Sequence, residues 1–366
     1  MKRWLHIIII LITGGMIAVA CSAIRSTGRY PSKKQQLVFE SLPNYLDGKF
    51  QNLYPPLDTT RKAVPKSRFR KERYSRFKKP VLSQKMPSVK TNLKDTVYTA
   101  PTITWFGHSS YLIQSKRFNI LVDPVFSGYG SPLWFINRNF DGSNIYSLKD
   151  MPDIDLLILT HDHYDHMDYK TLRKLRKSVD QVVVPSGVDR TMLYWGYDKD
   201  QLYVVNWSDT VPISPDIILT STPAQHFSGR RNKKNKTLWS SYVLDIHGYR
   251  LFLGGDGGYN LHFKDIGNKY GPFDLALLEN GQYSPYWPSS HCYPEQTAAA
   301  ALDLQADMLF PVHWAKFSAT YHSWNDPIYR LLPVADSLNI PVTVPKIGEP
   351  YTIGEPVKRT VWWNFD

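Results

Sequence analysis

The stretch Leu159–Asp168, LTHDHYDHMD, places three histidines and three aspartates within ten positions. It follows the apolar run 154–158, IDLLI, and it precedes 169–179, YKTLRKLRKSV, whose apolar residues are spaced as in a helix. We therefore expect the stretch to lie where a strand gives way to a helix, with Asp168 capping that helix. Open α/β sheets keep their ligand sites at this edge, beyond the carboxyl ends of the strands.

The spacing HxHxDH within this stretch indicates a metal site. In an extended segment His161, His163 and Asp165 point to the same side and His166 points elsewhere, so the ligands can be divided between two adjacent metal positions. Imidazole together with carboxylate suits zinc, and to a lesser degree iron or manganese. The alternative is a solvated polar loop, but the whole chain has only 11 histidines in 366 residues.

Two metal positions need further ligands from elsewhere in the chain. His226 follows the strand-like run 217–224, His313 follows the strand-like run 308–312, and Asp256 ends RLFLGGD. The glycines beside Asp256 allow backbone and metal to approach closely. A lone histidine is more often a satisfied polar residue, but the shared position just past a strand end favours one common site.

Short apolar runs of strand length recur from residue 96 onward, separated by turn residues. Helical spacing of apolar residues appears in three segments between them, 169–179, 294–305 and 326–338. Strands that first follow one another and then alternate with helices predict a layered α/β domain, which we place at 96–355. Composition agrees, because 42% hydrophobic and 14% aromatic residues suffice for a buried core.

The remaining segments differ in composition from this domain. Residues 21–95 are polar and proline-bearing, and we interpret them as a basic linker and N-terminal extension. Within them 61–80 holds ten Lys and Arg against one Glu, which accounts for most of the formal charge of +12. Residues 356–366 form a short aromatic C-terminal tail. Nucleic acid is not an expected partner, because no recognition module accompanies the basic run.

The N-terminus has the pattern of an export signal. A charged start at Lys2 and Arg3 is followed by an apolar core and by small residues. We expect the glycine pair 14–15 to interrupt the apolar stretch, leaving it too short for a spanning helix of about 20 residues. Residues 1–20 are therefore predicted to be a signal peptide, with an uncleaved membrane anchor as the alternative.

The four residues 18–21, AVAC, are similar to a bacterial lipobox, which predicts lipidation of Cys21. The other cysteine, Cys292, would then have no disulfide partner. We expect a lipoprotein of the bacterial cell envelope, in the outer membrane and facing the periplasm. Next to a lipid anchor, the basic segment 61–80 can also lie on anionic headgroups, at about 1 kcal/mol per basic residue.

The order of these motifs resembles the metallo-β-lactamase superfamily. They are HxHxDH, a lone His226, Gly-Asp at 255–256 and His-Trp at 313–314. Other motifs narrow the resemblance to the hydrolases of the N-acyl-phosphatidylethanolamine phospholipase D group, over roughly residues 95–350. These motifs are TWFGHSS (104–110), LVDPVFS (121–127), TPAQHFSGR (222–230), FLGGDGGYN (252–260), YGPFDLA (270–276) and HCYPEQTA (291–298).

The resemblance implies an αββα sandwich, in which two mixed β-sheets flanked by helices hold two Zn²⁺ ions, or other divalent ions, at their edge. One ion would be held by His161, His163 and His226, the other by Asp165, His166 and His313, and Asp256 would bridge them. Asp123 and His108 would support these ligands, because ligating histidines need oriented partners.

On the substrate side, the resemblance implies that His291 faces the phosphate, with Tyr286 and Trp287 beside the substrate. Here the chain departs from the family pattern, with Tyr286 in place of arginine, Ser290 in place of glutamine, and Cys292-Tyr293 in place of Val-Asp. These departures concern the substrate and leave the metal ligands intact.

The implied reaction is hydrolysis of a phosphodiester in an N-acyl-phosphatidylethanolamine-like phospholipid. Two divalent ions about 3.5–4 Å apart acidify a shared water, so hydroxide is available at neutral pH. The expected catalytic residues are Asp256, His291 and Asp165, and the products are an N-acylethanolamine and phosphatidic acid. Alternatives with the same ligands are a lactonase, a sugar-phosphate hydrolase or a nucleotide phosphodiesterase, and the non-enzymatic alternative is a metal- or lipid-binding lipoprotein.

Overall fold

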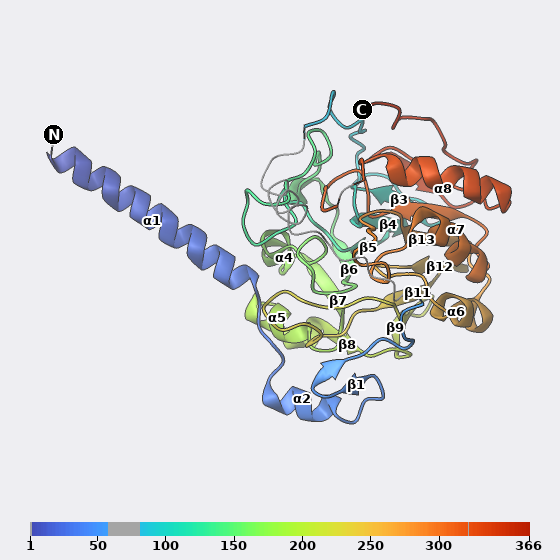
Figure 1. The fold of residues 1–366 in the computed structure, drawn as a ribbon, viewed down its shortest axis with the longest axis horizontal. Helices are drawn as coiled ribbons and strands as arrows, with labels where there is room; N and C mark the ends of the chain where they lie inside the picture. The colour runs from blue at the N-terminus through green and yellow to red at the C-terminus, as the bar shows by residue number, and fades with distance from the viewer. Residues whose placement is uncertain (1, 58–80, 321) are drawn as a thin grey trace.

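The structure, a computed structural model, describes residues 2–57, 81–320 and 322–366 (Figure 1). The basic segment 61–80 lies outside the described residues. Two sheets dominate the fold, and most of their strands coincide with the predicted apolar runs.

The first sheet has seven strands in the order β15-β3-β4-β5-β6-β7-β8. The strands are β3 (Thr102–Trp105), β4 (Tyr111–Ser115), β5 (Phe118–Val122), β6 (Ile154–Ile158), β7 (Val179–Pro185), β8 (Leu202–Val205) and β15 (Pro350–Thr352). Pairing is antiparallel from β15 to β5 and parallel from β5 to β8. Parallel pairing brings the carboxyl ends of β5, β6 and β7 to one edge.

The second sheet has six strands in the order β14-β13-β12-β11-β10-β9. They are β9 (Thr210–Ser214), β10 (Ile217–Thr222), β11 (Ser241–Ile246), β12 (Tyr249–Leu253), β13 (Leu275–Glu279) and β14 (Leu309–Val312). The pairs from β9 to β12 are antiparallel, whereas β12, β13 and β14 are parallel. This sheet is therefore mixed as well.

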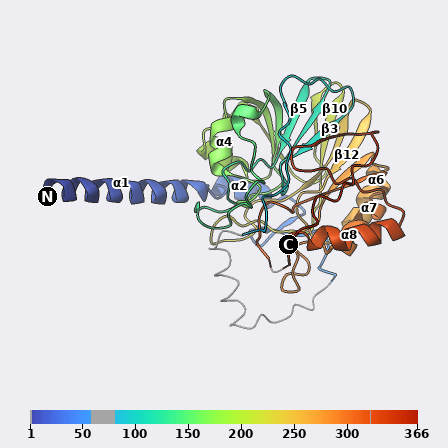
Figure 2. The ribbon, with the colours of Figure 1, turned by 90° about the horizontal axis from the view of Figure 1, so that it is seen from above.

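Helices cover the outer faces of the two sheets, α4 on one side and α6, α7 and α8 on the other (Figure 2). The helical segments of the domain are η1 (Leu148–Asp150), α4 (Tyr169–Leu175), α5 (Asp189–Tyr194), η2 (Lys199–Gln201), α6 (His262–Tyr270), α7 (Pro294–Asp303) and α8 (Asp326–Ser337). The three predicted helices correspond to α4, α7 and α8.

The alternation of side chains in β5 shows how the layers are built. Ile120 and Val122 belong to the core between the sheets, whereas Leu121 packs in a second cluster with Leu172 of α4. Burial on both faces explains why Ile120–Val122 is a continuous apolar run rather than an alternating one. The resulting αββα arrangement of two mixed sheets confirms the predicted fold class.

The N-terminal segment forms one continuous helix, α1 (Lys2–Ser26), which projects away from the domain (Figures 1 and 2). The expectation that Gly14 and Gly15 interrupt this segment is wrong. A helical glycine costs about 1 kcal/mol relative to alanine but keeps its backbone hydrogen bonds, so flanking apolar residues can carry the helix through. The part His6–Ser26 is long and apolar enough to cross a membrane, a property that signal sequences share.

The segments interpreted as extension and tail both contribute to the packed structure. The extension forms α2 (Lys33–Phe39) and a hairpin of β1 (Tyr45–Leu46) and β2 (Lys49–Phe50), whose aromatic residues pack with Leu238 and Trp239. In the tail, Trp362 stacks on Trp314 with ring centres 5.1 Å apart. The predicted boundaries at 95 and 355 thus separate segments that pack against one another.

Candidate metal centre

The loop that follows β6 carries four of the predicted ligands, and a tight turn divides them. The amide of Met167 donates to His163 O (2.8 Å), and Asp168 caps α4 by accepting from the Lys170 amide, as predicted. The turn places His161 and His163 in one cluster and Asp165 in another. The extended-segment argument, which put Asp165 on the side of His161 and His163, is therefore wrong.

The first cluster consists of His161, His163, His226 and Asp256, whose ligand atoms lie within 4.8 Å of one another. His163 Nδ1 lies 2.9 Å from His161 Nε2 and 3.3 Å from His226 Nε2. A single proton can bridge only one of these nitrogen pairs. A cation between the three nitrogens would satisfy all of their lone pairs.

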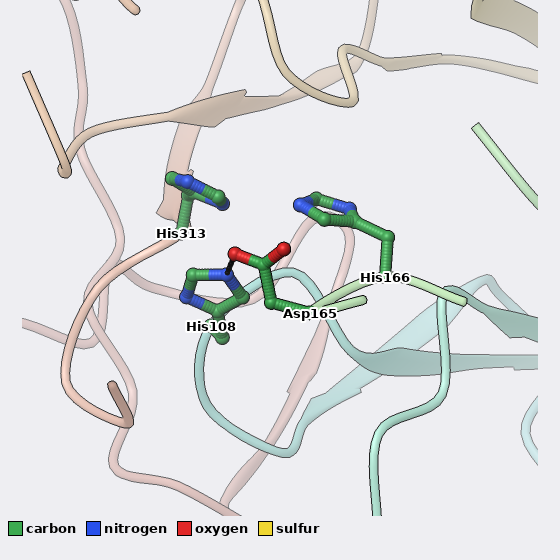
Figure 3. Close-up of side chains that lie close together, drawn as sticks. All are labelled: His108, Asp165, His166 and His313. Atoms are coloured by element: carbon green, nitrogen blue, oxygen red, sulfur yellow. Dashed lines mark hydrogen bonds and ion pairs between the residues drawn. The ribbon is translucent and has the colours of Figure 1, made fainter. Parts of the chain in front are cut away.

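The second cluster consists of His108, Asp165, His166 and His313 (Figure 3). The Asp165 carboxylate lies among the three rings, and its Oδ2 is 3.0 Å from His108 Nε2. This contact leaves the second oxygen of Asp165 available to a metal ion. His108 thus holds Asp165 in place, as the resemblance implied.

Asp256 lies between the two clusters. One carboxylate oxygen, Oδ2, is 3.1 Å from His166 Nε2 and 3.8 Å from His161 Nε2. The other, Oδ1, is 3.0 Å from His313 Nδ1. A carboxylate in contact with imidazoles of both clusters is suitably placed to be shared by two ions.

Burial and neighbouring charges shift the pKa values of these groups. Burial lowers the pKa of His161 and His226 well below the ordinary value, so both are neutral at pH 7. Burial by itself would raise the pKa of Asp256, but the imidazoles of His166 and His313 outweigh it and hold that pKa well below the usual range. The first cluster therefore combines an ionised carboxylate with the neutral imidazoles of His161 and His226. Burial by itself would lower the pKa of His166, but the Asp256 and Asp123 carboxylates outweigh it and raise that pKa well above the ordinary value.

Three residues of the centre have a left-handed backbone conformation. The φ angles are 54° for His108, 41° for Asp123 and 67° for His313. Such conformations cost on the order of 1–3 kcal/mol each and are found mainly at functional sites. A reciprocal pair of backbone contacts supports two of them, because the His313 amide donates to His108 O (2.8 Å) and the His108 amide donates to Trp314 O (2.9 Å).

The fit to metal ions is also visible in buried atoms without partners. Among the described residues the buried His313 Nε2 has no hydrogen-bond partner, and the buried His166 Nε2 and Asp256 Oδ1 have only the carboxylate–imidazole contacts given above. Leaving such atoms unsatisfied costs about 1–3 kcal/mol each. The two clusters and these unsatisfied atoms are consistent with a binuclear metal site.

Asp123 orients the ring of His166. Its Oδ2 accepts from His166 Nδ1 (2.8 Å) and from Thr160 Oγ1 (2.6 Å), and its Oδ1 accepts from the Thr160 amide (2.9 Å). The carboxylate therefore fixes the ring of His166 with Nε2 turned toward Asp256.

Asp123→Asn is expected to weaken metal binding by about 10- to 100-fold, because an amide NH₂ would oppose the Nδ1 proton of His166. Metal content after dialysis against buffered zinc measures this. Asp155→Asn is a matched control, since Asp155 accepts from the Asn119 amide at the far end of β6. Equal zinc affinity of the Asp123 variant and the wild type would exclude an orienting role for Asp123.

Two residues near the centre were not predicted from the sequence. Glu279 ends β13 at the same edge, and its Oε2 lies 2.6 Å from His291 Nδ1. Ser109 Oγ lies 2.8 Å from His313 Nδ1, which leaves Nε2 of that ring for a ligand. The position of Glu279 at a strand end was the available signal, and it is the same signal that identified Asp256 and His313.

Glu279 also affects the charge of His291. Burial by itself would lower the pKa of His291, but the Glu279 carboxylate outweighs it and raises the pKa to about 9. His291 therefore carries a proton at neutral pH.

A cavity of about 550 Å³ opens over the clusters. His163, Asp165, Asp256, His291 and His313 line its floor. The predicted substrate residues Tyr286 and Trp287 line it too, together with Phe227, Pro288 and Lys234. The structure thus brings together all the predicted ligands, and it places the predicted substrate residues around the same cavity.

The fold and the paired His/Asp clusters define a metal-dependent hydrolase. The family model "Beta-lactamase superfamily domain" matches residues 118–314, and the chain belongs to this superfamily. The chain is also similar to a solved metallo hydrolase of Ignicoccus hospitalis, with a TM-score of 0.55 and 22% identity, over 70% of this chain and all of that one. At this identity the likeness concerns the fold.

Three relatives extend the comparison. An uncharacterized protein of Mycobacterium tuberculosis is 33% identical over 90% of this chain and 89% of its own length. An N-acyl-phosphatidylethanolamine-hydrolyzing phospholipase D of Caenorhabditis elegans is 31% identical over 64% of this chain and 69% of its own length. The outer membrane protein RomA of Klebsiella pneumoniae is 46% identical over 28% of this chain and 78% of its own length.

Proposed function

We propose that the protein is a dinuclear zinc phosphodiesterase of phospholipase D type, which cleaves N-acyl-phosphatidylethanolamine-like lipids to an N-acylethanolamine and phosphatidic acid. The observation that carries the proposal is the cavity, in which a floor of predicted metal ligands meets a wall that combines aromatic residues with polar ones. The name of the C. elegans relative supports the substrate. A wall that includes Phe227, Trp287 and Pro288 suits a lipid better than a small polar lactone.

In this proposal His161, His163 and His226 would hold one ion, Asp165, His166 and His313 would hold the other, and Asp256 would be shared between them. Two such ions would supply an acidified water at neutral pH and an electrophilic clamp for a phosphoryl oxygen. The ionised Asp256 contacts histidines of both clusters and so fixes the position of one cluster relative to the other. His108 and Asp123 orient Asp165 and His166.

His291 is the residue we assign to the substrate phosphate. Glu279 engages its Nδ1, so Nε2 remains for an oxygen of the phosphate or of the leaving group. A protonated ring there stabilises negative charge and can donate a proton to the departing alcohol. Lys234, at the wall of the same cavity, adds a second positive charge for an anionic headgroup.

We also propose that the protein is attached to the bacterial cell envelope through its N-terminus, either by α1 or by lipid on Cys21. Supporting observations are the apolar helix and the similarity to a protein named as an outer membrane protein. An enzyme whose substrate is a membrane phospholipid gains from such attachment.

The test of the substrate is direct. Purified protein loaded with zinc is incubated with N-acyl-phosphatidylethanolamine, and both products are measured by mass spectrometry with and without chelator. We expect turnover that the chelator abolishes. Turnover that persists after verified metal removal would contradict the mechanism, whereas inactivity with both metal positions filled would contradict the substrate.

His291→Gln is expected to lower kcat for this lipid by about 10²- to 10⁴-fold, the usual contribution of a general acid, while the zinc content stays unchanged. The matched control is His247→Gln. His247 lies in the turn between β11 and β12, away from the cavity, and its ring contacts Ser115 at the end of β4. Wild-type kcat in the His291 variant would remove this residue from the reaction.

A further inference from the structure

The last turn of α1 is fixed to the domain by two side chains. Trp195 Nε1 donates to Arg25 O (2.9 Å), and the buried Arg230 donates through Nε to Ser26 O (2.6 Å). Arg230 also donates through Nη1 to Asp162 O (2.9 Å) in the metal-ligand loop. The end of the apolar helix therefore has a defined place beside the metal centre.

Two loops meet the base of α1 at this place. We call residues 131–137, SPLWFIN, the aromatic loop and residues 229–234, GRRNKK, the basic loop. A small cavity shows that they meet, because its lining includes Ser22, Ser26, Ser131, Pro132 and Arg230. Figure 1 shows α1 leaving the domain on this side, opposite to α6, α7 and α8.

The aromatic loop presents large apolar side chains to solvent. Trp134 is 54% exposed and Phe135 is 37% exposed, and their rings form an edge-to-face pair with centres 5.6 Å apart. Exposed aromatic residues that are grouped together indicate a surface that something covers. Tryptophan is enriched at membrane–water interfaces, where it lies at headgroup level.

The basic loop adds positive charge to the same face. Arg231 and Lys233 are exposed, and the loop is held to the chain just after α1, because the Lys233 amide donates to Tyr30 Oη (2.7 Å). Arg29 is exposed as well and lies 4.4 Å from the ring centre of Tyr194. Basic and aromatic residues that surround the point where an apolar helix leaves a domain are typical of a surface that contacts anionic lipid.

We propose that the aromatic loop and the basic loop together form a bilayer-contact surface that binds the headgroup region of a membrane containing anionic phospholipid. Trp134 and Phe135 enter the headgroup layer, and Arg231 and Lys233 face the lipid phosphates. Lys234, in the same loop, lines the cavity over the metal centre, so the surface leads from the bilayer to the cavity. The inference rests on the proposed membrane attachment but not on the proposed substrate.

The surface is the same whether α1 crosses the membrane or Cys21 carries lipid. If α1 crosses the membrane, its apolar span His6–Ser26 includes Ser22, and if Cys21 carries lipid, the anchor lies directly before Ser22. In both cases the anchor adjoins the contact between Ser22, Ser26 and the loops. The domain is then held against the membrane by contacts on the folded domain in addition to the anchor.

Hydrogen–deuterium exchange of the full chain tests this surface without any substrate. The protein is compared in detergent micelles, in phosphatidylcholine vesicles and in vesicles that also contain phosphatidylglycerol. We expect backbone exchange in 131–137 and 229–234 to slow by at least about tenfold in phosphatidylglycerol vesicles relative to micelles, with a smaller effect in phosphatidylcholine. Exchange at equal rates in all three would overturn the proposal.

Paired variants assign the effect to side chains. Arg231→Glu with Lys233→Glu should abolish the additional slowing of exchange that phosphatidylglycerol causes. Lys264→Glu with Lys269→Glu on α6 should retain this additional slowing. Trp134→Ser with Phe135→Ser should lose the protection of the aromatic loop. Leu302→Ser with Tyr329→Ser should not, because these residues are also exposed but belong to α7 and α8, the helices on the opposite side of the domain (Figure 1). Protection that persists in both loop variants would contradict the assignment. Inactivity toward the lipid with this exchange pattern intact would contradict only the substrate.

Discussion

Asp256→Asn should lower turnover by about a thousandfold or more and should reduce the metal bound per chain. The carboxylate contacts imidazoles of both clusters, at 3.1 Å from His166 and 3.0 Å from His313. An asparagine keeps the shape but loses the negative charge, and its NH₂ group cannot bind a cation. Losses of this size are typical when a group that stabilises charge in the reaction is removed.

Two measurements on the Asp256 variant separate its roles, namely kcat and zinc content by elemental analysis. Asp303→Asn is the matched control, because this carboxylate accepts from Tyr259 Oη outside the clusters. The control should retain both wild-type values. A variant at Asp256 with undiminished activity and full zinc content would show that this carboxylate is not a ligand shared by the two metal positions. Lipid affinity retained together with lost turnover would distinguish an enzyme from a simple lipid binder.

Chelation of the metal should lower the thermal unfolding midpoint by on the order of 10 °C. Ions that bind only the folded chain stabilise it by about 4 kcal/mol per site when present at a thousand times Kd. Without them, the buried His313 Nε2 has no partner among the described residues, and His166 Nε2 has only the Asp256 carboxylate. The metal-free centre therefore carries unsatisfied polar atoms that the loaded centre does not.

Differential scanning fluorimetry with and without chelator measures this shift, and added zinc should reverse it. The informative control is the Asp256→Asn variant, whose midpoint should respond much less to zinc. If the wild-type midpoint is the same with and without chelator, the clusters are not a metal site that contributes to stability.

The sequence predicted the ligand set because histidine and aspartate just past strand ends are recognisable without a structure. The grouping of Asp165 could not be obtained by treating the loop as extended, because the turn closed by the Met167 amide changes the direction of the chain. Glu279 was missed because a glutamate ending an apolar run is ordinarily a surface residue. Its position at a strand end was the one signal in the sequence, and the contact with His291 shows its role. Metal ligation by the assembled residues stays a prediction.

The same reasoning explains which parts of the fold were predicted. Strands buried on both faces, such as β5 and β6, are continuous apolar runs and were predicted. The edge strand β8 has four residues, of which two are exposed, and β15 has only three residues, so neither gives a clear pattern. The extension was interpreted as a linker because its anchoring rings, Phe39, Tyr45 and Phe50, follow no regular spacing.

The clusters combine residues from both halves of the chain, and this has a consequence for biogenesis. The loop after β6 in the first sheet provides one share of the ligands, and the segments after β10, β12 and β14 in the second sheet provide the rest. A nascent chain can therefore complete the first cluster only after Asp256, which follows β12, and the second cluster only after His313, which follows β14. Loading with metal must be a late event, and a chain truncated before β14 should leave the ribosome unable to retain the full complement.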